Sequence, residues 1–494
     1  MNPTITLGNQ GSEIEAVVAL CVDLDGTLVK TDTLLEAALA SLHRTPYTLV
    51  GACLSLYKGL PIFKTQLQTS GCLNVALLPY NEAVLELVRQ VRDQGRRTVL
   101  ITATHRALAV DIANYLGCFD EVYGTSDVIN LKGQQKAEFL VKRFGERGFD
   151  YIGNSSNDVP VWNAARRGFT VTNCTPTLTN GSAPAPLCEC SYRPTLKLLA
   201  KTARVHQWSK NILIAVPLLT SHRFTNLALI LHCAMAVCAL SCIASATYIF
   251  NDLFDIDADR LHNSKRFRPI PSATISIVQA MALAAGLAVV GAVLASLTSR
   301  ASVLLLATYV ICSLSYTVYF KRKLLVDVLM LAGLYTLRIL IGCAATHIAI
   351  SFWLLAFSVF VFFSLALIKR VTELAKDDMS RMHLSRGYMP LDREALVGIG
   401  TSSALAATVI LALYLNSREV QTLYARPEVL WLLCPLLLYW FSRNWVLVLR
   451  QKINDDPLVF VFRDRVSQVL SVVVLIIVAA ATFAGNLPMD WLHK

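Results

Sequence analysis

The chain has 494 residues, of which 54% are hydrophobic and 16% charged, and its mean hydropathy is +0.51. This composition excludes a wholly water-soluble protein and predicts an integral membrane protein with room for one soluble domain. The net charge of +11 comes largely from lysines and arginines beside apolar segments. That placement favours topology signals and phosphate ligands over a nucleic-acid-binding surface.

Two features of the chain bear on its compartment. The first 16 residues are polar and lack an apolar core, so we expect no signal peptide. The 13 cysteines are scattered, with Cys188 and Cys190 as the only close pair. This scatter predicts reduced, packed thiols in a cytosol-facing or membrane setting and no cysteine-based metal site.

A soluble domain is expected over residues 1–185, where short apolar runs alternate with helical patterns. Three runs end in polar side chains, which are Asp23 and Asp25, then Thr102, then Asn154 and Asp158; Lys136 opens a helical stretch between the second and third. The alternation predicts a doubly wound parallel α/β sheet. Ligands of such sheets bind at the carboxyl ends of the strands, where these polar residues would lie.

The sequence Asp23-Leu-Asp25-Gly26-Thr27, followed in order by Thr102, Lys136 and Asp158, resembles the haloacid dehalogenase (HAD) superfamily of phosphatases. The resemblance implies that Asp23 is the nucleophile and Asp25 the general acid and base. It also implies phosphate and Mg²⁺ ligands: Thr102 and Lys136 for the phosphate, and Asp23, Asp25, Asn154 and Asp158 for the metal. About 70 residues between the first two motifs, with helical patterns at 34–43 and 47–57, would form a cap.

One departure from the family pattern concerns the metal-binding loop. That loop usually begins with Gly-Asp, whereas this chain has Gly153 followed by Asn154. An amide oxygen can still ligate Mg²⁺, but it brings no charge, so the affinity should fall. A degenerate phosphatase kept as a regulatory or docking module therefore stays open, as does Lys132 in the role given to Lys136.

Residues 175–193 are rich in Pro, Ser, Thr, Asn and Gly, and we place a linker at 186–203 and an all-α membrane bundle at 204–494. Nine membrane segments are expected, near 210–222, 226–250, 275–296, 301–320, 325–345, 348–368, 395–415, 429–448 and 468–487. The 210–222 segment carries the weakest signal because it is short.

The distribution of positive charge predicts the orientation of these segments. With a cytosolic soluble domain, four connections also face the cytosol: 251–274, 321–324, 369–394 and 449–467. They hold 17 lysines and arginines, against five in the opposite loops and the tail. The positive-inside rule therefore predicts a multi-pass protein of a bacterial-type inner membrane, with the HAD-like domain and the active sites facing the cytoplasm.

The connection after the 226–250 segment carries a cluster of aspartates: Asp252, Asp255, Asp257 and Asp259. At helical spacing Asp252, Asp255 and Asp259 share one face, whereas Asp257 points elsewhere. Three carboxylates on one face repel each other unless a divalent cation neutralises them, and Mg²⁺ prefers such oxygen ligands. A solvated, charged loop is the alternative interpretation.

The aspartates are followed by a basic cluster of Lys265, Arg266 and Arg268, which would supply counter-charge for substrate phosphates. The run Asn251-Asp252-x-x-Asp255-x-x-x-Asp259, with Arg268-Pro269-Ile270, looks like the first aspartate-rich motif of the UbiA superfamily of intramembrane transferases. The resemblance covers the chain from about residue 192 onward. It implies that the three aspartates are catalytic metal ligands and that Asn251 contacts the substrate.

Further candidate substrate ligands lie on the same side of the membrane: Lys210, Tyr316, Lys321, Asp327, Arg338 and Lys369. Arg338 is the strongest of them because an arginine inside a span is costly unless it faces a polar cavity. A pairing of Arg338 with Asp327, three helical turns away, is sterically poor. Snorkelling stays open for Lys210, and a topology role alone stays open for Lys321 and Lys369.

Prenyltransferases of the UbiA kind typically carry a second aspartate-rich cluster, in the connection corresponding to 369–394. Here that connection is net basic, and Asp377 and Asp378 are adjacent, so they cannot share a helical face. One acidic cluster with many cations suits one Mg-diphosphate and a second anionic substrate. Together with residues 206–211 and Arg338 with Gly342, this pattern is similar to the decaprenyl-phosphate phosphoribosyltransferase branch of the UbiA family.

That resemblance implies transfer of 5-phosphoribose from phosphoribosyl diphosphate to a polyprenyl phosphate lipid, with Mg²⁺ as cofactor. A phosphatase on the same membrane face would then remove the 5-phosphate and give polyprenyl-phosphate ribose. Two alternatives stay open: a UbiA-type prenyltransferase acting on an aromatic or other small acceptor, and a transporter or scaffold with a regulatory soluble domain. The sequence is silent on oligomeric state, so a homo-oligomer stays open.

Overall fold

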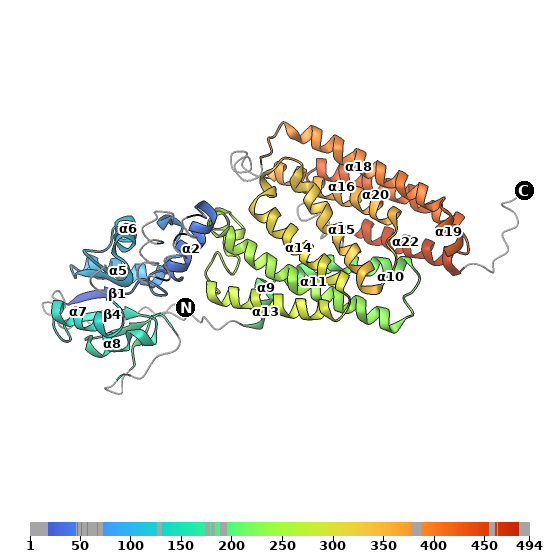
Figure 1. Ribbon diagram of the computed structural model, residues 1–494. Helices are drawn as coiled ribbons and strands as arrows, with labels where there is room; N and C mark the ends of the chain where they lie inside the picture. The colour runs from blue at the N-terminus through green and yellow to red at the C-terminus, as the bar shows by residue number, and fades with distance from the viewer. Residues whose placement is uncertain are drawn as a thin grey trace, which may run out of the picture. The chain divides into compact units, whose positions relative to one another are not determined.

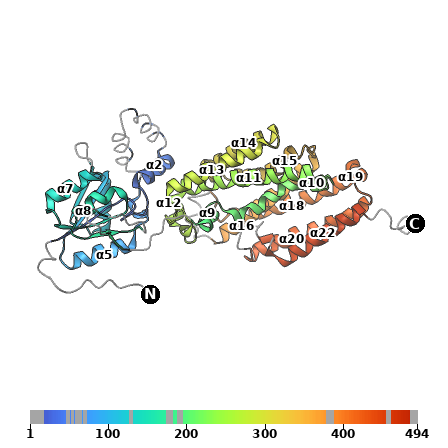
Figure 2. The same cartoon turned by 90° about the horizontal axis from the view of Figure 1, so that it is seen from below.

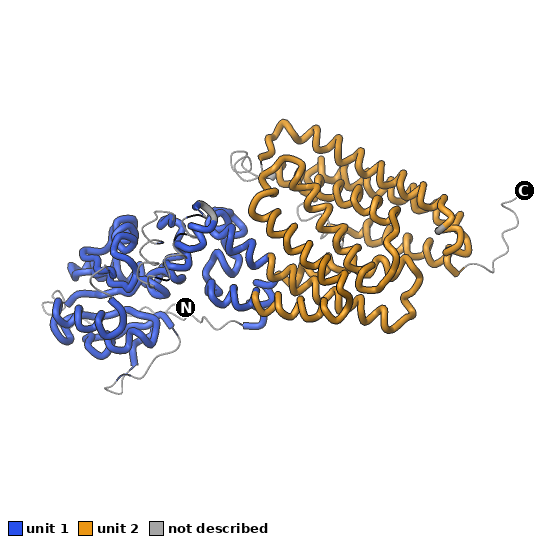
Figure 3. Tube along the Cα trace, in the orientation of Figure 1, with its two compact units in different colours: residues 1–203, 248–284 blue, residues 204–247, 285–494 orange. Residues whose placement is uncertain are grey.

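The computed structural model describes residues 18–45, 73–125, 131–172, 183–187, 195–376, 387–453 and 463–483, with single positions at 47, 51, 57, 67 and 178 and the pair 460–461. The chain divides into two compact units, coloured separately in Figure 3. Unit 1 comprises residues 1–203 and 248–284, and unit 2 comprises residues 204–247 and 285–494. Most of the second expected cap helix, 47–57, and the adjacent Asp377 and Asp378 lie outside the described residues.

Unit 1 contains a six-stranded, all-parallel sheet, as the alternating pattern predicts. Its strands are β1 (Ala19–Val22), β2 (Thr98–His105), β3 (Glu121–Thr125), β4 (Phe149–Gly153), β5 (Gly168–Thr170) and β6 (Ala185–Pro186). They are ordered β3-β2-β1-β4-β5-β6, so β1 is central and pairs with both β2 and β4. This is the doubly wound order, which brings the carboxyl ends of β1, β2 and β4 to one edge of the sheet.

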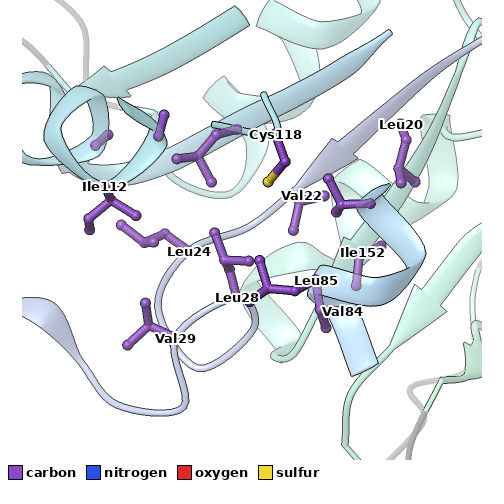
Figure 4. Packing of buried hydrophobic residues seen from close by; sticks show 14 of the residues in the cluster. Leu20, Val22, Leu24, Leu28, Val29, Val84, Leu85, Ile112, Cys118 and Ile152 are labelled. Atoms are coloured by element: carbon purple, nitrogen blue, oxygen red, sulfur yellow. The ribbon is translucent and has the colours of Figure 1, made fainter. Parts of the chain in front are cut away.

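Helices cover both faces of this sheet (Figures 1 and 2). They are α5 (Glu82–Asp93) and α6 (Arg106–Leu116) on one face, and α7 (Gln134–Phe144) and α8 (Val159–Ala164) on the other. Because side chains alternate along a strand, Leu20 and Val22 of β1 pack with α5 and α6, whereas Ala19 and Cys21 pack with α7 and α8. Figure 4 shows the first of these two cores, with Leu20 and Val22 close to Val84 and Leu85 of α5.

The remaining described helices of unit 1 are α2 (Thr33–Arg44), η2 (Val75–Leu77), η3 (Ser156–Asp158), α9 (Leu196–Thr202), α12 (Ile256–Leu261) and η5 (Lys265–Phe267), where η denotes a 3₁₀ helix. Helix α2 confirms the helix expected at 34–43. It begins where Asp32 accepts hydrogen bonds from the backbone N–H groups of Leu34 and Leu35, a standard N-terminal cap.

Unit 2 is helical. Its elements, with two helices that continue into unit 1, are η4 (Val205–Ala215), α10 (Val216–Thr220), α11 (Leu227–Phe254), α13 (Ile277–Ser296), α14 (Arg300–Val318), η6 (Phe320–Arg322), α15 (Val326–Thr346), α16 (Phe352–Lys376), α18 (Asp392–Leu415), α19 (Arg418–Leu423), η7 (Pro427–Leu432), α20 (Leu433–Leu449) and α22 (Arg465–Phe483). Helix α15 packs against α14, α16 and η4, and α16 packs against α18.

Eight helices in the described part of the chain are long and apolar enough to cross a membrane, and they match eight of the nine expected segments. The chain is a multi-pass membrane protein. The segment expected at 210–222 differs from the other eight. It is a 3₁₀ helix, η4, followed by the short α10, whose second residue is Pro217.

Candidate functional site

Strand β1 ends at Val22 and delivers Asp23 to the edge of the sheet, where Lys136 of α7 reaches it. The Lys136 ammonium donates to Asp23 Oδ1 at 2.6 Å and to the Tyr151 hydroxyl at 3.1 Å. Burial alone would lower the pKa of Lys136, but the carboxylates of Asp23 and Asp158 outweigh it and raise that pKa. The lysine therefore stays protonated, as a phosphate ligand must. Lys132 is exposed, so Lys136 is the lysine that the fold places at Asp23.

Asp25 lies two residues further on and is held by two donors. The backbone N–H of Thr33 donates to Asp25 Oδ1 at 2.7 Å, and the Thr104 hydroxyl donates to Oδ2 at 2.5 Å. Burial raises the pKa of Asp25, and it raises the pKa of Asp23 to about 7 although Lys136 acts in the opposite direction. A raised pKa suits the carboxyl group that must carry a proton, which is the role expected for Asp25.

Thr102 and Asp158 complete this edge of the sheet. The buried Thr102 hydroxyl accepts a hydrogen bond from the Thr104 backbone N–H at 3.0 Å. Asp158 accepts from the Tyr151 hydroxyl at 2.7 Å and from the backbone N–H groups of Asn154 and Ser155, both at 3.1 Å. These bonds fix the loop that follows β4.

The Asn154 side chain lies against the turn that follows Asp25. A Cβ atom on Gly26 would lie 1.9 Å from Asn154 Nδ2, and Gly26 has a φ of +73°, so only glycine fits there. The close approach brings an amide group over the same turn as the Asp23 and Asp25 carboxylates. Carboxylate and amide oxygens suit Mg²⁺, and the expectation that Asp23, Asp25, Asn154 and Asp158 would hold it stays a prediction.

The aspartate cluster of the membrane domain lies at the end of α11. The helix breaks at Asp255, which caps the short α12, and the cluster therefore spans two helical pieces. Nη1 of Arg268 donates to Asp252 Oδ1 at 3.2 Å and to Asp259 Oδ2 at 2.8 Å. Lys265 Nζ lies 3.7 Å from the other oxygen of Asp259. Two buried carboxylates thus converge on a single cationic nitrogen.

This convergence bears on metal binding. No group of three or more His, Cys, Asp or Glu side chains is placed to hold one metal ion within the described ranges. Mg²⁺ commonly uses one or two carboxylates and takes its other ligands from substrate phosphates and water. Asp252 and Asp259, already directed at one cation, fit that arrangement. The neighbouring candidates are less buried than these two aspartates. Asn251 and Asp255 are half-buried, and the exposed Arg266 stacks over the Phe267 ring.

Unit 2 contributes a separate buried group of cations and aromatic rings. Arg338 of α15 donates to Asn211 Oδ1 at 3.1 Å, to the Leu334 carbonyl oxygen at 2.5 Å and to the Tyr309 hydroxyl at 3.3 Å. Its guanidinium lies 4.8 Å from the centroid of the Tyr335 ring, and the Lys210 ammonium lies 6.0 Å from the same centroid. Lys210 is only 8% exposed, so it is buried beside Tyr335.

The close approach of η4 to α15 places Lys210 and Asn211 beside Arg338. A Cβ atom on Gly342 would lie 2.1 Å from the carbonyl oxygen of Ile214. Glycine at this position, one helical turn beyond Arg338, therefore lets the two backbones touch. The glycine acts through packing, and its effect is to hold the two buried cations on adjacent elements.

Asp327 belongs to a second buried network, centred on Arg370 of α16. Arg370 donates to Asp327 and Glu373, and to the Tyr316 hydroxyl at 3.0 Å, while the Tyr388 hydroxyl donates to Asp327. Both Asp327 and Arg370 are 0% exposed. The network ties α14, α15, α16 and the segment that precedes α18 together. Lys321 and Lys369 are half-buried, and their binding roles, like those of Tyr316 and Asp327, stay predictions.

Two family models match this chain, one over each part. Residues 212–467, more than half of the chain, match the model of the UbiA prenyltransferase family. The chain belongs to the UbiA prenyltransferase family. Residues 20–162 of this UbiA-family chain match the haloacid dehalogenase-like hydrolase family, so both resemblances drawn from the motifs are confirmed.

Several proteins resemble this UbiA-family chain. The uncharacterized protein y4nM of Sinorhizobium fredii is 36% identical over 454 residues, which cover 91% of this chain and 88% of that protein. The decaprenyl-phosphate phosphoribosyltransferase of Mycolicibacterium smegmatis is 27% identical over 283 residues, covering 55% and 88%. A solved UbiA homolog from Archaeoglobus fulgidus bound to GPP and Mg²⁺ has a TM-score of 0.43 at 15% identity, covering 58% and 99%.

Several residues of these sites were absent from the sequence-based expectations. In the phosphatase-like site they are Thr33, Thr104 and Tyr151; in the membrane sites they are Tyr309 and Tyr335. One of them had a signal, since Thr104 is two positions from Thr102 in the same strand. The others meet their partners only through tertiary packing.

Proposed function

We propose that this chain transfers 5-phosphoribose from phosphoribosyl diphosphate to a polyprenyl phosphate, releasing diphosphate. The observation that carries the proposal is the convergence of Asp252 and Asp259 on one nitrogen of Arg268. It supports a site whose two carboxylates would hold a divalent cation, which would supply positive charge to a substrate diphosphate. Membership of the UbiA family and the resemblance to the Mycolicibacterium enzyme support the choice of substrates.

In this reaction the bond from the anomeric carbon of ribose to the diphosphate oxygen breaks, and a bond from that carbon to an oxygen of the lipid phosphate forms. Mg²⁺, when bound, would supply positive charge that stabilises the departing diphosphate. The lipid phosphate is already an anion and needs no general base, but it needs cations to hold it. Lys210 and Arg338, both buried beside the Tyr335 ring, supply two such cations.

We further propose that the HAD-like domain hydrolyses the 5-phosphate of the lipid product to give polyprenyl-phosphate ribose. Asp23 attacks the phosphorus atom while Asp25 donates a proton to the departing 5-oxygen of ribose. Asp25 then takes a proton from the water molecule that releases inorganic phosphate from Asp23. Lys136 supports this assignment, because its buried ammonium lies at Asp23 and would neutralise charge on the phosphate.

The transfer step is tested by incorporation of radiolabel from phosphoribosyl diphosphate into lipid. The assay uses purified protein, Mg²⁺ and polyprenyl phosphate, with Asp252→Asn as the variant. We expect label in the lipid fraction with the native chain and none with Asp252→Asn. Labelling of a small acceptor from a prenyl diphosphate, with no label from phosphoribosyl diphosphate, would instead establish the prenyltransferase alternative.

The hydrolytic step is tested in the same assay by the release of inorganic phosphate. We expect Asp23→Asn to abolish phosphate release while label still enters the lipid, because the variant removes only the proposed nucleophile. Equal phosphate release from the native chain and from Asp23→Asn would show that the HAD-like domain does not catalyse this step, and would leave a docking or regulatory role for it.

A further inference from the structure

A buried ion pair joins the HAD-like domain to the aspartate segment within unit 1. Arg260 of α12 donates through Nη1 and Nη2 to the two carboxylate oxygens of Glu36 on α2, at 3.0 and 2.6 Å. The Glu36 side chain is 1% exposed and that of Arg260 is 7% exposed. This two-point contact connects residues 224 positions apart in the sequence, and neither belongs to the motifs of either catalytic site.

Arg260 also organises the segment that carries the aspartates. Its Nε donates to the carbonyl oxygen of Pro271 at 3.1 Å and so closes the loop that contains Lys265 and Arg268. The preceding residue, Asp259, is one of the two carboxylates bound to Arg268. A single guanidinium is therefore bonded at once to Glu36 and to the backbone of the loop that holds the counter-ion of the aspartate pair.

Glu36 lies equally close to a residue that organises the phosphatase-like site. It lies one helical turn after Thr33, the first residue of α2, whose backbone N–H donates to Asp25. The short η2, on the far side of the segment expected to form the cap, also contacts α12. Elements from both ends of that segment thus meet the same helix.

We propose that α2 and η2 form a docking surface for α12, and that Glu36 and Arg260 are positioning residues that order α2 and the aspartate segment together. Removing one member of a buried pair leaves the other charge buried without compensation, so the pair favours a state in which both elements are in place over one in which either is displaced. The inference concerns folding of the chain and is independent of which substrates are used.

Hydrogen exchange of the full-length chain, read by mass spectrometry in lipid nanodiscs, tests this surface. We expect Glu36→Gln to accelerate exchange in α2 and also in α12 and residues 265–272, by roughly tenfold or more. Arg260→Gln should have a larger effect on residues 265–272, because it also removes the bond to Pro271. Glu36→Asp keeps the charge on a shorter side chain, so we expect a well-folded variant whose exchange rates lie between those of the native chain and Glu36→Gln.

The charge-exchanged double variant, Glu36→Arg with Arg260→Glu, provides the decisive comparison. We expect it to restore exchange in α2 and α12 to within about threefold of the native chain, because opposite charges again face each other. Arg143→Gln is the matched control, since it breaks an exposed pair with Glu121 in the same unit and should leave α12 unchanged. Acceleration confined to the element that carries each substitution, with no recovery in the double variant, would overturn the proposal. Neither outcome depends on turnover.

Discussion

At the scale of single residues, Arg268 neutralises two carboxylates that would otherwise repel each other. Arg268→Gln removes that counter-ion, and we expect the thermal midpoint measured without metal to fall. Mg²⁺ should then raise the midpoint of the variant more than that of the native chain, by roughly 2 °C or more, because the ion no longer competes with a guanidinium. Arg266→Gln is the control, since Arg266 is exposed and stacks over Phe267. An equal gain from Mg²⁺ in all three proteins would contradict this role for Arg268.

Asp150, on β4, gives a prediction about pH. Burial alone would raise the pKa of its carboxyl, but hydrogen bonds from Arg166 and Arg96 outweigh burial and lower it. A carboxyl whose pKa is lower in the folded than in the unfolded chain stabilises the fold above the unfolded pKa of about 3.9, and that contribution is lost as the pH falls through the folded pKa. Asp150→Asn should therefore cost about 3 kcal/mol at pH 7 and progressively less below pH 4.

Thermal unfolding of the full chain at pH 7, 5 and 3 measures this difference. Asp111→Asn serves as the control because Asp111 is exposed in the middle of α6, and it should change little at any pH. If the penalty for Asp150→Asn were the same at pH 3 as at pH 7, the ion pairs would not be its cause.

Single residues also show how far the sequence could predict the sites. The contact of Lys136 with Asp23 follows from motif order, because parallel strands bring their carboxyl ends to one edge. Glu36 and Arg260 carry no such signal: each looks like an ordinary charged residue of a short helix, and only tertiary packing buries them together. The burial of Arg370 could not be predicted from the sequence either, because a lysine-arginine pair at the end of a span is first explained as a topology signal.

At the scale of elements, the approach of η4 to α15 determines whether Lys210, Asn211 and Arg338 lie together. Gly342→Ala places a Cβ atom 2.1 Å from the Ile214 carbonyl oxygen if nothing moves, so η4 must shift. We expect a loss of about 1–3 kcal/mol in stability, which is the usual cost of overpacking. If the proposed transfer uses these cations, the KM for the lipid phosphate should also rise.

The same helix offers a matched control for that substitution. Nothing lies within 4 Å of a Cβ atom built on Gly333, so Gly333→Ala adds a methyl group without a clash and should be neutral or slightly stabilising. Thermal unfolding of the two variants side by side separates the clash from the general effect of adding a methyl group to α15. Equal midpoints would mean that η4 accommodates the Cβ atom at no cost.

Element boundaries were harder to predict than element types. The hydrophobic pattern identified the eight long spans because each is an apolar helix of 19 to 28 residues, long enough to cross a membrane. The break at Asp255 and the 3₁₀ form of η4 left no mark in that pattern, since both depend on hydrogen bonding along the backbone. The structure joins Asp252 and Asp259 through Arg268, across the break between α11 and α12, and the alignment of Asp255 with them stays a prediction.

At the scale of the whole molecule, the residue ranges that make up unit 1 determine how many times the chain must cross a membrane. Residues 1–203 and 248–284 belong to one compact unit, joined by the Glu36 and Arg260 pair, so we expect the HAD-like domain and the connection between α11 and α13 on the same side of a membrane. Helix α11 crosses the membrane once between them. The chain from 204 to 226 must therefore cross as well, although no α-helix of sufficient length is present there.

The 3₁₀ form of η4 explains how so short a segment can cross. A 3₁₀ helix rises about 2 Å per residue against 1.5 Å for an α-helix, so η4 and α10 together extend about 30 Å, the thickness of a bilayer core. Both elements pack along α15, which is itself a candidate span. This favours the ninth crossing expected from the sequence.

Cysteine labelling with a membrane-impermeant maleimide tests this topology in intact cells. We expect Arg223→Cys, in the exposed loop between α10 and α11, to react from outside, and Lys323→Cys, between α14 and α15, to react only after the membrane is permeabilised. The native chain sets the background from its own cysteines. Three candidate spans, α11, α13 and α14, separate Arg223 from Lys323, so these two positions react from opposite sides in either topology, and Asp111→Cys, exposed in the HAD-like domain, decides between the topologies. If Asp111→Cys reacted from outside together with Arg223→Cys, η4 and α10 would return without crossing. The aspartate segment would then face away from the HAD-like domain, and a buried bond between Glu36 and Arg260 could not form.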